Sequence, residues 1–117
     1  MIINKSKNKV IAKNKKICTN YITQSIGLMF QPKKKDFGLI FQFNKDVIAS
    51  IHMFFVFFSI DIIWLDKSNK VITMKENVRP FTFHINPKIK SRYFIELPKN
   101  TIKAKKIEIG DFIYWNK

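Results

Sequence analysis

Residues 50–66 read SIHMFFVFFSIDIIWLD, an almost wholly apolar run that is rich in phenylalanine. Its part without acids or lysines is shorter than the ~20 residues that a helix needs to cross a bilayer. Phe, Ile and Val also lose rotamer freedom in a helix, whereas they pack well on a pleated sheet. We therefore predict two strands, at 51–55 and 60–65 with a kink near Ser59, and no membrane span.

The strand predicted at 60–65 is mostly apolar on both faces, because side chains alternate along a strand. We expect it to be central in a sheet that is covered on each side. Asp61 lies on one of these apolar faces, so its carboxylate must be paired or hydrogen-bonded. The polar segment 66–69 starts with Asp66, which favours a type I turn, and 71–75 is predicted to return as the antiparallel partner. The faces are Ile60, Ile62 and Trp64 on one side and Asp61, Ile63 and Leu65 on the other.

Two short helices are predicted. In 19–30 the apolar residues recur at helical intervals, and Gly27 lies near the end of the pattern, where it weakens the last turn. The second helix, in 100–107, has Asn100 or Thr101 as its expected N-cap.

The remaining pattern is that of strands joined by turns. Gly110 supplies a turn residue, and Asp111 is expected to stabilise that turn. Only MIINKSK, residues 1–7, has the composition of a frayed terminus. With 117 residues and no linker, the sequence predicts one compact α+β domain, mainly antiparallel β, as a barrel or sandwich-like sheet with one or two short helices. The other strands are predicted within 8–14, 37–44, 79–86, 91–98 and 111–115.

The composition is strongly basic, with a formal net charge of +14 and 46% hydrophobic residues. Polyanion contact and a solvated surface set by an A/T-rich genome are both open explanations of this charge. Lysine vastly outnumbers arginine, so any nucleic-acid contact should be non-specific and confined to low salt. The lone Cys18 and the absence of a signal-peptide pattern favour the cytoplasm.

Four motifs occur in the order and spacing of a known family: GLMF, HMFFVFFSIDIIWLD, RYFIELP and IEIGDFIYW. Over about residues 8–115 the chain resembles the domain of unknown function 192 family of prokaryotes. The positions that carry the family pattern are Met53, Ile60, Asp61, Leu65 and Asp66. The resemblance implies a compact, mainly antiparallel β domain, and it implies no reaction, because the activity of the family is not established.

No catalytic or metal-binding pattern is present. The sequence lacks C-x-x-C and H-x-x-x-H spacings, and three glycines cannot build a phosphate-binding loop. We therefore predict no metal, no cofactor and no recognisable catalytic constellation, although an enzyme without a nameable reaction stays open as a third class.

Two function classes remain. The first is a non-enzymatic ligand-binding or accessory module for a small molecule or protein, with a pocket lined by His52, Met53, Asp61 and Glu96. For each of these residues a purely structural role is the competing interpretation. The alternative is a basic protein that binds nucleic acid non-specifically through its lysine-rich surface, with exposed phenylalanines stacking on bases.

Overall fold

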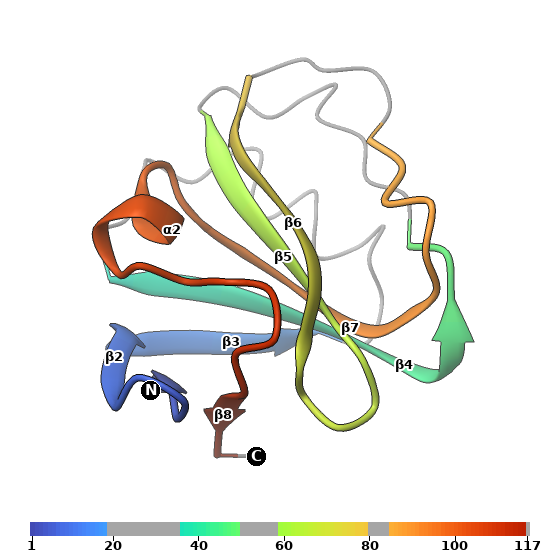
Figure 1. Cartoon of the computed structure of the whole chain (residues 1–117), viewed down its shortest axis with the longest axis horizontal. Coiled ribbons are helices and arrows are strands. Elements are labelled where there is room, and N and C mark those ends of the chain that lie inside the picture. The colour runs from blue at the N-terminus through green and yellow to red at the C-terminus, as the bar shows by residue number, and fades with distance from the viewer. Residues whose placement is uncertain (19–35, 50–58, 80–84, 117) are drawn as a thin grey trace.

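The computed structural model describes residues 1–18, 36–49, 59–79 and 85–116 (Figure 1). Their strands form a three-stranded sheet in the order β2-β1-β8 and a five-stranded sheet in the order β3-β4-β7-β5-β6. The elements are β1 (Ile2–Asn4), β2 (Lys9–Ala12), β3 (Asn14–Cys18), β4 (Phe37–Val47), β5 (Ile60–Leu65), β6 (Val71–Val78), β7 (Ser91–Pro98), α2 (Thr101–Ala104) and β8 (Ile113–Trp115).

The predicted central strand is confirmed. Every residue of β5 is buried, and β5 lies between β7 and β6 in the larger sheet. It pairs antiparallel with β6 across the turn at Asp66, as predicted, with bulges beside Asp61 and Leu65. The strand predicted at 51–55, the helix at 19–30 and most of the strand at 79–86 lie outside the described residues.

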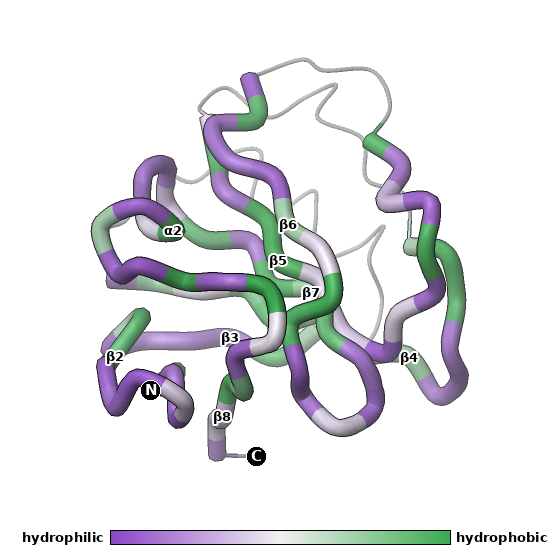
Figure 2. The backbone as a smooth tube through the Cα atoms, viewed as in Figure 1, coloured by the Kyte–Doolittle hydropathy of each residue, from purple (hydrophilic) through white to green (hydrophobic). Residues whose placement is uncertain are grey.

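The alternation along β5 separates two apolar clusters, one on each face of the five-stranded sheet. Ile63 and Leu65 pack with Ile95 of β7 and with residues of the three-stranded sheet. Ile62 and Trp64 face the other way, with Phe94 of β7. In Figure 2 the apolar colour concentrates where β5 and β7 cross the middle of the molecule. The described strands therefore form a sandwich of two sheets, not one closed barrel.

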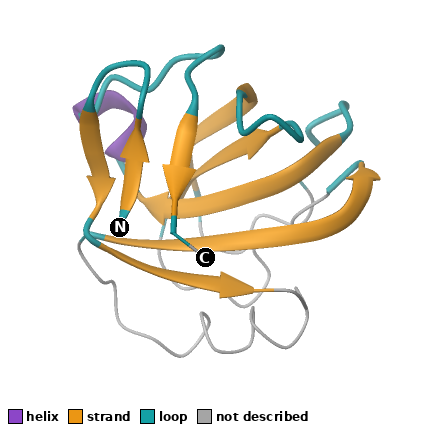
Figure 3. Cartoon of the chain, turned by 90° about the horizontal axis from the view of Figure 1, so that it is seen from below, coloured by secondary structure: helices purple, strands orange, loops and turns teal. Residues whose placement is uncertain are grey.

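The frayed terminus predicted for residues 1–7 is wrong. β1 is the middle strand of the smaller sheet, and the Ile2 and Asn4 side chains are fully buried. β1 pairs with β8, so the two ends of the chain lie side by side, and the short strands run across the long ones (Figure 3). Of the two fully buried side chains only Ile2 is apolar, and the rest of the segment is largely polar, which is why its composition resembles that of a tail.

One pairing departs from the antiparallel pattern. β3 lies parallel to β4, with Cys18 opposite Phe41. The sequence predicted no strand at 14–18, because its lysine-rich pattern places only Ile17 and Cys18 against apolar neighbours. The mainly antiparallel fold class nevertheless holds, since the other strand pairs are antiparallel.

Candidate functional site

Asp61 connects three elements through its carboxylate. Its Oδ1 accepts a hydrogen bond of 2.8 Å from the backbone N–H of Asn77, and its Oδ2 accepts one of 2.8 Å from the N–H of Ile102. Asn77 has a left-handed φ of 49° at the β6 bulge opposite Asp61, and Ile102 lies in the first turn of α2. A bulge and a helix start each leave an N–H without a ladder partner. Asp61 therefore supplies the missing acceptor to both.

The helix cap differs from the one predicted. Asn100 occupies the N-cap position with φ 69°, and its side chain makes no capping hydrogen bond. The Thr101 hydroxyl donates to the carbonyl of Pro98 at 2.6 Å instead of accepting from the helix. The capping oxygen thus comes from a strand 41 positions away, a relationship that no local sequence pattern reveals.

Glu96 has the opposite environment. On β7 it pairs with Leu39 of β4 and Ile62 of β5, it is 4% exposed, and no donor within the described part of the chain reaches its Oε2. Burial raises the pKa of this carboxyl to about 8. At neutral pH the group is therefore largely protonated, and it can donate a hydrogen bond as well as accept one.

Cys18 lies on the same face of the sheet as Glu96. Burial raises the pKa of its thiol, and the positive charge of Lys16 lowers it in part. A buried, protonated thiol is a weak nucleophile and behaves as a small apolar side chain. Cys18 is thus part of the packing around this face.

The predicted binding residues are not all brought together. Asp61 pairs with Leu97 and Glu96 with Ile62, so the two carboxyl groups point to opposite faces of one sheet. His52 and Met53 lie outside the described residues, as does Gly27. A binding role for these residues stays a prediction, and in the structure each carboxylate oxygen of Asp61 already accepts one backbone hydrogen bond.

The turn residues have clear roles. Asp66 Oδ1 accepts from the N–H groups of Ser68 at 2.9 Å and Lys70 at 3.0 Å, which closes the β5–β6 turn. Gly110 has φ 99°, a backbone conformation that residues with a side chain rarely adopt.

Asp111 is the centre of a polar cluster that ties the last turn to the N-terminus. Its Oδ2 accepts from Asn4 Nδ2 at 2.8 Å, Lys7 Nζ at 2.9 Å and the N–H of Glu108 at 3.0 Å. Burial alone would raise the pKa of Asp111, but these donors outweigh it and hold the pKa below its usual value. The sequence did not predict Asn4 and Lys7 as its partners, because they lie more than a hundred positions away.

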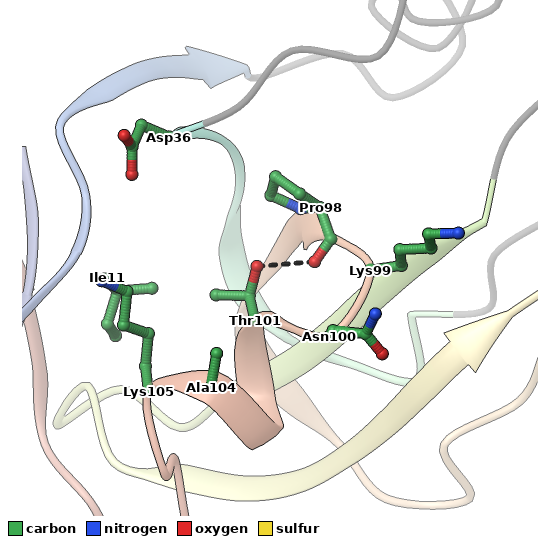
Figure 4. A pocket seen from close by; sticks show the side chains of 8 residues that line it. All are labelled: Ile11, Asp36, Pro98, Lys99, Asn100, Thr101, Ala104 and Lys105. Atoms are coloured by element: carbon green, nitrogen blue, oxygen red, sulfur yellow. Dashed lines mark hydrogen bonds between the residues drawn. The ribbon is translucent and has the colours of Figure 1, made fainter.

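Two surface hollows lie on either side of α2. One, of about 240 Å³, includes Asp36, Thr101 and Lys105 in its lining (Figure 4). The other, of about 630 Å³, lies over Asn77, Ile102 and Lys106. Apart from Ile11, the side chains around the first hollow are exposed or half-buried, and both hollows mix lysines with carboxylates. Both hollows are open to solvent, whereas small-molecule sites usually enclose most of the ligand.

Metal and membrane sites are not seen in the described ranges. No three His, Cys, Asp or Glu residues there come close enough to hold a metal ion. Over the same residues, no helix combines the length and the apolar character needed to cross a bilayer.

Comparison with known proteins agrees with the motifs and the sheet order. The DUF192 family model, described as "Uncharacterized ACR", matches residues 2–115. The chain belongs to the DUF192 family. A UPF0127 protein of Thermococcus sibiricus is 40% identical and the match covers 98% of this chain and 74% of the relative. UPF0127 protein PH1112 of Pyrococcus horikoshii is 36% identical, and the match covers 98% of each chain.

Two crystal structures share the fold of this DUF192 chain. A protein of unknown function from Novosphingobium aromaticivorans is 19% identical, with a TM-score of 0.85 over 97% of this chain and 82% of the other. A "putative transcription regulator" from Sinorhizobium meliloti is 20% identical, with a TM-score of 0.78 over 86% of this chain and 79% of the other. At these identities the likeness concerns the fold alone.

Proposed function

We propose that the chain is a non-enzymatic ligand-binding module and that its ligand contacts the carboxyl group of Glu96. The observation that carries this proposal is the buried Oε2 without a donor. Buried polar groups in native proteins are almost always satisfied, so one that is not requires an explanation. Glu96 lies between Leu39 and Ile62, where an apolar side chain would serve the packing as well or better.

The environment of Glu96 favours a particular class of ligand. A carboxyl that is largely protonated at neutral pH can donate to a carbonyl or ether oxygen, and it can also give its proton to an amine and pair with the resulting cation. The apolar cluster on this face favours a ligand that is otherwise hydrocarbon. We therefore expect a small, mostly apolar molecule with a single polar head group.

A thermal-shift series tests this proposal, with hexanamide, hexylamine and hexane as probes. Because a ligand that binds only the folded state stabilises it by mass action, the two polar probes should raise the unfolding midpoint of the wild type. Glu96→Leu should fold and lose this response. Glu76→Gln, at an exposed position of β6, is the matched control and should keep it. Equal responses in the wild type and Glu96→Leu would contradict the proposal.

A second candidate function is sequence-indifferent binding of nucleic acid. The observation that favours it is the charge distribution: the first acid of the chain is Asp36, and six lysines precede residue 18. Lys5, Lys7, Lys9 and Lys13 lie in or beside the strands of the smaller sheet, and Lys15 and Lys16 lie in β3 of the larger one. The description of the Sinorhizobium protein as a regulator is compatible with this candidate, but the charge is what carries it.

A further inference from the structure

The outer face of the three-stranded sheet carries exposed apolar side chains in one row. Ile3 of β1 pairs with Val10 of β2 on one side and with Tyr114 of β8 on the other. Val10 is 38% exposed and Tyr114 is 45% exposed, and Ile3 between them is half-buried. Phe112 precedes Tyr114 by two residues, so it projects from the same side, and it is also 45% exposed.

A lysine lies over the Tyr114 ring, and a second lysine is bridged to Phe112 through the backbone. Lys5 Nζ is 4.9 Å from the centroid of the Tyr114 ring, and the Lys5 backbone N–H donates to the carbonyl of Phe112 at 2.8 Å. Lys70 forms an isolated antiparallel bridge with Phe112, and opposed residues of such a pair project to the same side. β1, β2 and β8 contain no acid.

We infer that this outer face, which we call the Tyr114 face (Ile3, Lys5, Val10, Lys70, Phe112 and Tyr114), binds single-stranded nucleic acid. Proteins that bind single strands without sequence preference combine aromatic rings, on which bases stack, with cations that contact phosphates. Tyr114 and Phe112 supply the rings, and Lys5 and Lys70 supply the cations. The inference rests on the second candidate function above and gives it a location.

The positive charge of the protein favours a single strand over the other partners that an exposed apolar face could bind. A second copy of the chain would bring another net charge of +14 against the first, which opposes self-association. A duplex keeps its bases stacked inside, so it would meet the lysines but could not use the rings. A single strand satisfies both the rings and the lysines. An anionic membrane surface would also meet an apolar, basic face, and the experiment below tests it.

Fluorescence anisotropy with a labelled oligo(dT) tests the inference at about 50 mM salt. The wild type should bind it more tightly than a duplex of equal length. Tyr114→Ala should weaken binding roughly 5- to 150-fold, the range expected for the loss of one stacked base, whereas Tyr114→Phe should retain it. Raising the salt to about 200 mM should weaken binding steeply, because lysines meet phosphates as point charges.

Matched variants locate the site. Ile89→Ala removes an exposed apolar side chain elsewhere and should leave binding unchanged. Lys5→Gln should weaken binding more than Lys45→Gln, which removes an exposed lysine from β4. If oligo(dT) binds but Tyr114→Ala binds like the wild type, the Tyr114 face is the wrong location and the nucleic-acid candidate survives. If no oligonucleotide binds at low salt, both fail, and binding only to phosphatidylserine vesicles would replace them with a membrane partner.

Discussion

Asp61 and Glu96 lie on the neighbouring strands β5 and β7, in successive rows of their pairing, with their carboxyl groups on opposite faces of one sheet. Both side chains are almost completely buried. Asp61 accepts two backbone hydrogen bonds of 2.8 Å, while Oε2 of Glu96 has no donor among the residues that the structure describes. The two buried carboxyl groups are one residue out of register. We expect the Asp61 carboxylate to stabilise the fold and the Glu96 carboxyl to destabilise it, so substituting each in turn tests both expectations.

Asp61→Asn should lower the free energy of unfolding by about 1–3 kcal/mol. The amide keeps the shape of the side chain, but one of its two positions becomes a donor, so the N–H of Asn77 or of Ile102 loses its acceptor. Denaturant unfolding of the wild type and the variant measures the difference. Asp46→Asn is the control, because it breaks only a partly exposed ion pair with Arg92 and should cost little. An unchanged midpoint for Asp61→Asn would show that the carboxylate is not needed by the fold.

Glu96 should make stability depend on pH in a defined window. Its pKa is about 8 in the folded state and about 4.5 when unfolded, so between these values the folded chain holds a proton that the unfolded chain has released. The contribution of Glu96 to the free energy of unfolding is fully present below pH 4.5. It should fall by about 1.4 kcal/mol per pH unit as the pH rises toward 8. Denaturant unfolding from pH 5 to 9 measures this slope.

The matched variant for this titration is Glu96→Gln, which cannot ionise. As the pH rises through this window, the wild type should lose stability relative to Glu96→Gln, because only the wild type can ionise at this position. The contributions of other titrating groups cancel in the difference between the two proteins. Glu96→Leu should also be at least as stable as the wild type at pH 7. A difference that stays constant from pH 5 to 9 would mean that Glu96 keeps an ordinary pKa in the folded protein.

The local periodicity of the sequence carries much of the fold. The alternation at Ile62 and Ile63 predicted a doubly covered central strand, and the structure places these residues in separate apolar clusters. The acid at Asp61 amid apolar neighbours predicted a buried carboxylate with internal partners. These predictions succeed because an apolar side chain must be buried, and a buried carboxylate must be hydrogen-bonded, whichever part of the chain supplies the partners.

What the sequence could not predict depends on contacts between distant segments. Asn4 meets Asp111 across 107 positions, so the polar letters of the N-terminal segment resemble those of a tail until the partner is known. The parallel pairing of β3 with β4 is of the same kind, since it brings two segments together without a hairpin turn. The opposite directions of Asp61 and Glu96 follow from the strand register, which the sequence of each strand leaves open.

Asn4→Ala should lower the free energy of unfolding by about 1–3 kcal/mol, because Asn4 is fully buried and donates to Asp111 Oδ2 at 2.8 Å. The stability of the variant should also depend less on pH in the acid range than that of the wild type. The pKa of Asp111 is depressed in the folded state, so its contribution is present above its ordinary pKa of 3.8 and is lost as the pH falls through the lower folded value. Losing the Asn4 donor narrows the gap between the folded and the ordinary pKa of Asp111, so the variant should lose less stability between pH 7 and pH 3 than the wild type does. Unfolding at pH 7 and pH 3 measures both effects, and Asn116→Ala, at an exposed position, should change neither.

Gly38 of β4 lies directly against Ile2 of the smaller sheet. A Cβ at this position would collide with Cδ1 of Ile2 in β1 and would lie 3.2 Å from Cδ2 of Leu97. Since Ile2 and Leu97 are buried, Gly38→Ala should cost about 1–3 kcal/mol through overpacking. Ile2→Val removes the colliding Cδ1 and should by itself cost about 0.5–1.5 kcal/mol. In the double variant the added methyl group fills the space that Ile2→Val leaves, so the combined loss should be clearly smaller than the sum of the two single losses. Denaturant unfolding of all four proteins measures this coupling, and strict additivity would mean that β1 does not pack on β4 at Gly38.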